Sequence, residues 1–137
     1  MTETERLIRA YYAAFAAGNR AAMFALVAED IAHDVNQGGR RLGKPAFRAF
    51  LAQMDAAYEE RIEDLVVMVD GTGARAAAEF TVVGRYLRTD PGLPEARGQA
   101  YRLPAGAFFE VRDGRIGRVS THYNLNDWIA QVNAGGA

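Results

Sequence analysis

The chain has 137 residues, of which 50% are apolar and 24% charged, which is typical of one globular domain spanning residues 1–137. A net charge of −1 does not attract polyanions, so neither nucleic acid nor a membrane surface is an expected partner, and the absence of cysteine excludes disulfides and Cys-ligated zinc. The acidic start at residues 1–5 is unlike a secretory signal, and no apolar run approaches the ~20 residues of a membrane span, so a cytoplasmic location is expected.

Helices are expected first along the chain. Thr2 and Glu5 have the spacing of a capping box, and the apolar residues between 7 and 15 recur with helical period. Gly18 is suited to end this helix and Asn19 to cap a second, shorter one. The N-terminal region is therefore predicted to hold two consecutive helices.

A short strand and a third helix follow. Residues 31–35 alternate as a strand, and residues 36–39, Asn-Gln-Gly-Gly, are typical of a turn. The sequence Gly43-Lys44-Pro45 favours a helix start, since proline fits the first helical turn. Met54 and Tyr58 are expected on the inner face of this helix, as core or pocket wall.

The C-terminal half has the pattern of long antiparallel strands. From Ile62 onward the apolar period changes, and two Asp-Gly pairs, at 70–71 and 113–114, are hairpin signals. The polar loop 88–98 contains two prolines, and it either covers the mouth of a pocket or simply connects two strands. The expected strands are 65–69, 74–87, 99–112 and 115–124, and a short helix begins at 126.

Helices followed by long strands predict an α+β fold, with the helices packed on one face of a curved antiparallel sheet. Several strands are apolar on both faces, for example at 82–83 and 107–109. A sheet whose outer face is also apolar is usually covered by another subunit. We therefore expect a homodimer formed through that outer face.

Five segments, at 11–19, 26–30, 33–47, 101–110 and 112–116, together with the order of the elements, carry a resemblance to a known family. They resemble the nuclear transport factor 2-like superfamily, and within it the SnoaL-like and ketosteroid isomerase-related proteins. The resemblance covers almost the whole chain and implies a cone-shaped fold in which the sheet curls around an apolar pocket. Because the superfamily includes isomerases, dehydratases, cyclases and binding subunits without catalysis, fold alone does not give the function.

Two of the three parts of the ketosteroid isomerase site are missing. The resemblance places the family's tyrosine at Tyr11, but its base at Val35 and its second carboxylic acid at about Ala107. A slip of one residue would bring Asp34 to the base position, but it would also turn the strand's faces over. With Val35 inward, Asp34 points outward and His33 points into the pocket. A true steroid isomerase is therefore not expected.

His33 and Tyr11 are the candidate catalytic residues. A pocket imidazole titrates near neutral pH and is a common general base, although His33 could equally be a core histidine bonded to a backbone carbonyl. Tyr11 could donate a hydrogen bond to a carbonyl or enolate oxygen, or it could be an ordinary buried tyrosine.

Other residues are expected to line the pocket. Val119, Thr121 and Tyr123 share one face of the last strand, and His122 points away from it. Two histidines without a well-placed carboxylate are a poor metal signal, so neither metal nor cofactor is expected.

Strand 99–112 is expected to turn Gln99, Tyr101 and Ala107 toward the pocket. Glu79 interrupts an apolar strand, and it is either a pocket carboxylate with a raised pKa or, as we favour, an outward partner of Arg85 or Arg102.

The sequence leaves two functions of different classes open. In the first, the protein is a cofactor-independent isomerase, dehydratase or cyclase acting on a small apolar carbonyl compound, with His33 as base and Tyr11, with Tyr123, holding the oxyanion. In the second, it is a binding or structural dimer without catalysis, in which protein groups form all the hydrogen bonds of the His33 ring. Convergence of His33 and Tyr11 on one cavity distinguishes the two.

Overall fold

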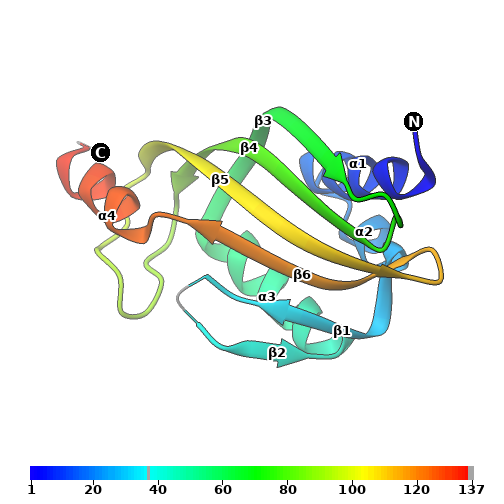
Figure 1. Cartoon of the computed structure of the whole chain (residues 1–137). Helices are drawn as coiled ribbons and strands as arrows, with labels where there is room; N and C mark the ends of the chain where they lie inside the picture. The colour runs from blue at the N-terminus through cyan, green and yellow to red at the C-terminus, as the bar shows by residue number, and fades with distance from the viewer. Residues whose placement is uncertain (37, 136–137) are drawn as a thin grey trace.

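The computed structural model describes residues 1–36 and 38–135, and four helices and six strands lie within them (Figure 1). The helices are α1 (Glu3–Ala16), α2 (Arg20–Leu26), α3 (Lys44–Ala57) and α4 (Leu125–Ala134). The strands are β1 (Val27–Asp34), β2 (Arg40–Leu42), β3 (Tyr58–Val69), β4 (Arg75–Tyr86), β5 (Gln99–Arg112) and β6 (Arg115–Tyr123).

The six strands form one curved sheet in the order β2-β1-β6-β5-β4-β3. All neighbours are antiparallel except β1 and β6, which run parallel, so the sheet is mixed where an antiparallel one was expected. Helices α1 to α3 lie on one face of the sheet, and α4 lies at one end of it (Figure 1). The α+β fold predicted from the sequence is confirmed.

The caps of the helices follow from their sequences. Thr2 caps α1 by accepting a hydrogen bond from the backbone N–H of Glu5, and Asn19 caps α2 in the same way from Ala22. Gly18, between the two helices, has a φ of 68°, a left-handed conformation that side chains with a Cβ disfavour. These bonds fix the ends of two helices that cover the sheet.

The start of β3 differs most from the prediction. The strand begins at Tyr58, four residues before the change of period at Ile62, because the chain leaves α3 directly into the sheet. Glu60 occupies an inward position of this strand and so interrupts the apolar alternation that would have identified it. A bulge follows, with Asp64 at φ 56° and a shift of register between Glu63 and Val66.

Smaller differences concern the first strand. β1 extends back to Val27, and residues 40–42 form the short edge strand β2, which the sequence did not predict. Gln37, in the expected turn at 36–39, lies outside the described residues.

Two buried clusters hold the fold together. The larger joins α1, α2 and α3 to the sheet and includes Ile8, Phe47 and Phe109. The smaller lies under α4, where Trp128 packs edge-on against Tyr86 at 4.8 Å between ring centroids. Among the described helices, none is long and apolar enough to cross a membrane.

Candidate active site

A cavity of about 770 Å³ lies between the helices and the concave face of the sheet. Most of its wall is apolar, and the polar side chains that reach it come from separate elements. The apolar wall includes Phe15, Phe50, Met54, Ile62, Phe80, Val82 and Trp128. A mostly apolar concavity with a few convergent polar groups is the usual form of a small-molecule site.

His33 lies in this wall, on β1, with 5% of its surface exposed. Its ring packs edge-on against Phe47 and Phe50, at centroid distances of 5.3 and 4.5 Å. Its Nδ1 is buried and has no hydrogen-bond partner among the described residues. Burial, reinforced by the charge of Arg41, lowers the pKa of His33 to about 4, although Asp34 opposes the shift. The imidazole is therefore neutral at pH 7.

Asn36, just beyond β1, is a second polar residue of the same wall. Its Oδ1 accepts a hydrogen bond from the backbone N–H of Tyr123, which ties the end of β1 to the end of β6. Its Nδ2 is buried without a partner in the described part of the chain, as is Nδ1 of His33. Both residues belong to the cavity lining, whereas these two nitrogen atoms are themselves buried.

Tyr11 reaches the cavity from α1. Its ring packs edge-on against Tyr12 and Phe109, and burial raises the pKa of its phenol well above the usual value, although the charge of Arg20 opposes this. Arg20 is itself held by Asp55 of α3, with Nε 2.9 Å from Oδ2. The phenol remains protonated over the working pH range and can donate a hydrogen bond.

Glu60 brings a carboxylate into the cavity from β3. The hydroxyl of Tyr101 donates to its Oε2 at 2.5 Å. Burial raises the pKa of Glu60, while the hydrogen bond from Tyr101 and the charge of Arg20 lower it. The net shift is upward, as expected for a carboxyl group in an apolar wall.

The loop 88–98 forms part of the cavity wall, since Asp90, Pro91 and Leu93 belong to the lining. Asp90 accepts hydrogen bonds from the hydroxyl of Tyr58, at 2.8 Å, and from the side chain of Gln53, at 3.0 Å. Of the two roles considered for this loop, the covering one fits this arrangement.

Seven of the thirteen site residues named from the sequence line the cavity, namely His33, Tyr11, Val35, Met54, Tyr58, Thr121 and Tyr123. Ala107 and Val119 are almost fully buried in the core cluster beneath it. Tyr101 is connected to the cavity through its hydroxyl group, which donates a hydrogen bond to the lining residue Glu60. His33 and Tyr11 therefore both line this cavity.

Gln99 is placed elsewhere. Its side chain is fully buried toward the loop and α4, where its Nε2 donates to the carbonyls of Glu95 and Val132, at 2.9 and 3.2 Å. The side-chain amide forms hydrogen bonds with backbone groups there, and it does not line the cavity. The expectation that Gln99 turns toward the pocket is corrected accordingly.

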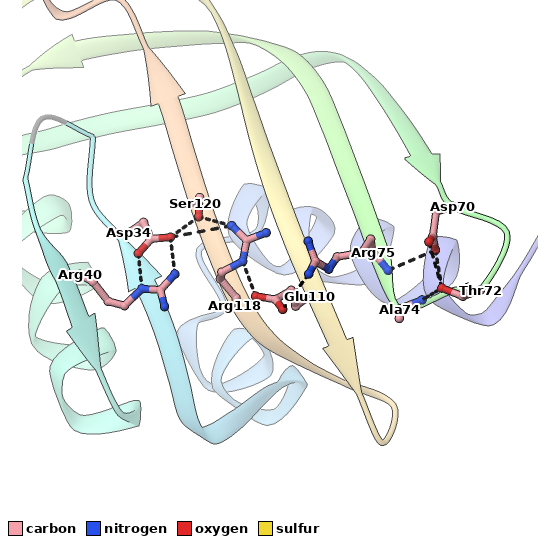
Figure 2. A network of polar contacts seen from close by, with 9 residues as sticks. All are labelled: Asp34, Arg40, Asp70, Thr72, Ala74, Arg75, Glu110, Arg118 and Ser120. Carbon is pink, nitrogen blue, oxygen red and sulfur yellow. Dashed lines mark hydrogen bonds and ion pairs between the residues drawn. The ribbon is translucent and has the colours of Figure 1, made fainter.

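Asp34 and Glu79 lie on the outer face of the sheet. Asp34 pairs with Arg40 and Ser120, which lowers the pKa of its carboxyl group to about 2, chiefly through the hydrogen bond from Arg40. Figure 2 shows this pair at one end of a chain of polar contacts across the outer face, through Arg118, Glu110 and Arg75 to the β3–β4 turn. Asp34 therefore does not replace the missing base.

Glu79 is exposed on this face. The two arginines considered as its partners bind other groups: Arg102 pairs with Glu63 at 2.9 Å, and Arg85 donates to the carbonyl of Gly98. The outward orientation of Glu79 fits the structure, but the expected ion pair is not formed.

Three cavity residues, Asn36, Glu60 and Asp90, were not predicted from the sequence. Asn36 and Asp90 carry only the signal of a turn or loop, which does not distinguish a cavity wall from a solvated surface. Glu60 could have been found from the strand alternation Tyr58-Glu60-Ile62, had the helix been ended at Ala57. Within the described residues, no group of three His, Asp or Glu side chains is arranged to hold a metal ion.

Comparison with known proteins agrees with this architecture. Crystal structures of candidate polyketide cyclases from Pseudomonas putida KT2440 and Silicibacter sp. TM1040 are 57% and 53% identical to the chain, with TM-scores of 0.93 and 0.94. The first alignment covers 96% of this chain and 98% of that one, and the second covers 96% of both.

An NTF2-like protein of unknown function from Burkholderia pseudomallei K96243, 17% identical over 98% of this chain and 100% of that one, shares the fold at a TM-score of 0.80. No curated protein matches the chain. The SnoaL-like domain model matches residues 8–119. The chain therefore belongs to the SnoaL-like family, a group within the NTF2-like fold.

Proposed function

We propose that this protein binds a small, mostly apolar carbonyl compound in its cavity and moves a proton on it without a cofactor, as an isomerase or cyclase does. The observation that carries the proposal is the mostly apolar cavity that four polar side chains reach from separate elements, those of Tyr11, His33, Asn36 and Glu60. A mostly apolar wall with a few convergent polar groups suits a small ligand that carries a single polar function.

The chemistry of these groups favours binding of a carbonyl or enolate oxygen. The amide of Asn36 is a donor, and the phenol of Tyr11 is held protonated by its burial. His33 is neutral, so it serves as a hydrogen-bond partner of the ligand; as a base it would be weak, because a pKa of about 4 makes its conjugate acid as strong as a carboxylic acid. Donors aimed at an oxygen that gains charge favour enolisation.

The relatives support the reaction class. Three solved structures that are more than 50% identical over nearly the whole chain are candidate polyketide cyclases, and polyketides carry the carbonyl groups that this cavity would accept. We infer a substrate of two or more rings with at least one ketone, since the cavity volume of about 770 Å³ exceeds what a single ring fills.

The test uses 2-tetralone, a two-ring ketone whose acidic protons exchange with solvent through the enol. Trp128, the only tryptophan of the chain, lines the cavity, so its fluorescence reports binding. Proton NMR in D₂O reports exchange. We expect the fluorescence to saturate with 2-tetralone and the exchange to run faster with protein than in buffer alone.

Controls come from the two histidines. His33→Phe removes the imidazole from the cavity, whereas His122→Phe makes the same change on the exposed outer face. We expect His33→Phe to weaken binding and slow exchange, and His122→Phe to change neither. Binding without accelerated exchange would instead support the alternative of a ligand-binding protein without catalysis.

We also propose that a second copy of the chain covers the outer face of the sheet. Phe108 and Met68 are about half exposed there, at 52% and 50%, and both strands pair with β4 at Ala77, so the two side chains lie in one row. Arg75 and Glu110, which pair with each other two residues along β4 and β5 from this row, place both signs of charge beside it. Sedimentation should show a dimer, and Phe108→Lys should give a monomer; a wild-type monomer would refute the proposal.

A further inference from the structure

Three residues form one row across the inner face of the sheet at its β3 edge. Glu60 of β3 pairs with Gly84 of β4, and Gly84 pairs in turn with Tyr101 of β5. The outer two residues of this row are joined by the hydrogen bond from the Tyr101 hydroxyl to Oε2 of Glu60, across the glycine between them.

Gly84 makes that contact possible. A Cβ added at this position would lie 2.6 Å from the hydroxyl oxygen and from Cζ of Tyr101, which is closer than real Cβ contacts come. Any other residue would push the phenol off the strand and away from the carboxylate. The glycine is thus required by a close approach, not by its φ angle.

The bond leaves one oxygen of the carboxylate available to the cavity. Oε2 accepts the phenol, and Oε1 has no hydrogen-bond partner among the described residues. The charge of Arg20 from α2 acts on Glu60, and burial, reinforced by the negative charge of Glu60, raises the pKa of Tyr123 on β6. Glu60 is therefore electrostatically coupled to three other elements around the cavity.

We propose that Glu60 is the catalytic base of the proton transfer, with Tyr101 as its positioning residue. This assignment rests on the proposed function. The family's base position is occupied by Val35, at the end of β1, which has no proton chemistry. Glu60 supplies a carboxylate from β3, near the opposite edge of the sheet, and the curvature of the sheet brings both strands to one cavity.

The step is a simple enolisation. Oε1 of Glu60 takes a proton from the carbon next to the ligand's carbonyl, and the electrons of that C–H bond form the C=C bond of an enolate. The carbonyl oxygen receives the π electrons and is stabilised by the donors of Asn36 and Tyr11. The proton returns from Glu60 to the same or a conjugated carbon, which restores the carbonyl and the carboxylate.

Burial suits Glu60 to this role. A base is most effective when its pKa lies near the working pH, and burial raises the pKa of Glu60 toward that range. The hydrogen bond from Tyr101 favours the ionised form and holds Oε2, which leaves Oε1 free of that bond. Loss of that bond should therefore raise the pKa of Glu60 further.

The first experiment measures deuterium exchange into 2-tetralone by Glu60→Gln. We expect exchange above the buffer rate to fall by about 10²–10⁴-fold, the range that general bases contribute, while Trp128 fluorescence still reports binding. Glu79→Gln, the same change on the exposed outer face of the next strand, serves as the matched control and should exchange as the wild type does.

The outcomes separate this assignment from the function on which it rests. Exchange by Glu60→Gln at the wild-type rate overturns the assignment of Glu60 and leaves the proposed function standing. Wild-type protein that binds 2-tetralone but does not accelerate its exchange overturns both.

A second experiment reads Glu60 directly in the free protein, by carbon NMR of glutamate labelled at the carboxyl carbon. We expect Glu60 to titrate above the usual range for glutamate, and Tyr101→Phe to raise its pKa and move the pH profile of exchange in the alkaline direction. An ordinary pKa for Glu60, or one that Tyr101→Phe leaves unchanged, would show that the phenol does not position this carboxylate.

Discussion

His33 should make the protein sensitive to acid. In the folded protein its pKa is about 4, against 6.5 for an ordinary histidine. Because the folded pKa is depressed, the stability that this group contributes is fully present above pH 6.5 and is lost as the pH falls toward 4. The shift corresponds to a loss of about 3 kcal/mol in the free energy of unfolding between pH 7 and pH 4.

The assay is urea unfolding, followed by circular dichroism, at several pH values between 7 and 4. His33→Phe removes the titration while keeping a ring that can pack against Phe47 and Phe50. Since Nδ1 of His33 has no partner among the described residues, the variant should be about as stable as the wild type at pH 7. At pH 4 it should be more stable by about 3 kcal/mol.

The control is His122→Phe, which changes the exposed histidine and should follow the wild-type profile. Asp34 does not alter the difference in stability between the variants and the wild type, because it is present in all three proteins. Its pKa of about 2 also keeps it ionised in the folded protein throughout this range. Equal acid sensitivity of His33→Phe and the wild type would refute the buried, neutral state of His33.

Further predictions concern the sheet and its outer face. Gly84→Ala should lower the free energy of unfolding by roughly 1–3 kcal/mol, as overpacking does, because its Cβ would clash with Tyr101; urea unfolding measures this, and an unchanged midpoint would contradict the close approach. Asp34→Asn removes an ion pair with Arg40 at a partly exposed site, so we expect a loss of no more than about 1 kcal/mol that shrinks in high salt. A loss independent of salt would mean that the contact is not mainly electrostatic.

Much of the fold could be predicted from the sequence because its signals are local. Capping residues such as Thr2 and Asn19, the helix start at Gly43 to Pro45, and the hairpin turn at Asp70 all act within a few residues of themselves. The parallel pairing of β1 with β6 could not be predicted in this way, since it joins strands more than eighty residues apart.

The same distinction between local signals and long-range pairing applies to the residues of the cavity. The strand alternation around Ile31 and Val35 was enough to direct His33 inward and Asp34 outward. Glu60 was missed because its meaning depends on register: only the pairing through Gly84 brings Tyr101 to it. Gln99 was misplaced because it lies at the start of β5. There α4 and the loop 88–98 cover the inner face, which lines the cavity only farther along the strand.

The most direct test of the proposed site is a crystal structure of the protein with 2-tetralone bound. We predict the rings against the apolar wall around Met54 and Phe80, and the ketone oxygen within hydrogen-bond distance of His33 or Asn36. The carbon beside the carbonyl should face Oε1 of Glu60. A ligand bound on the outer face, or one in the cavity with its oxygen turned away from both His33 and Asn36, would contradict the proposed function.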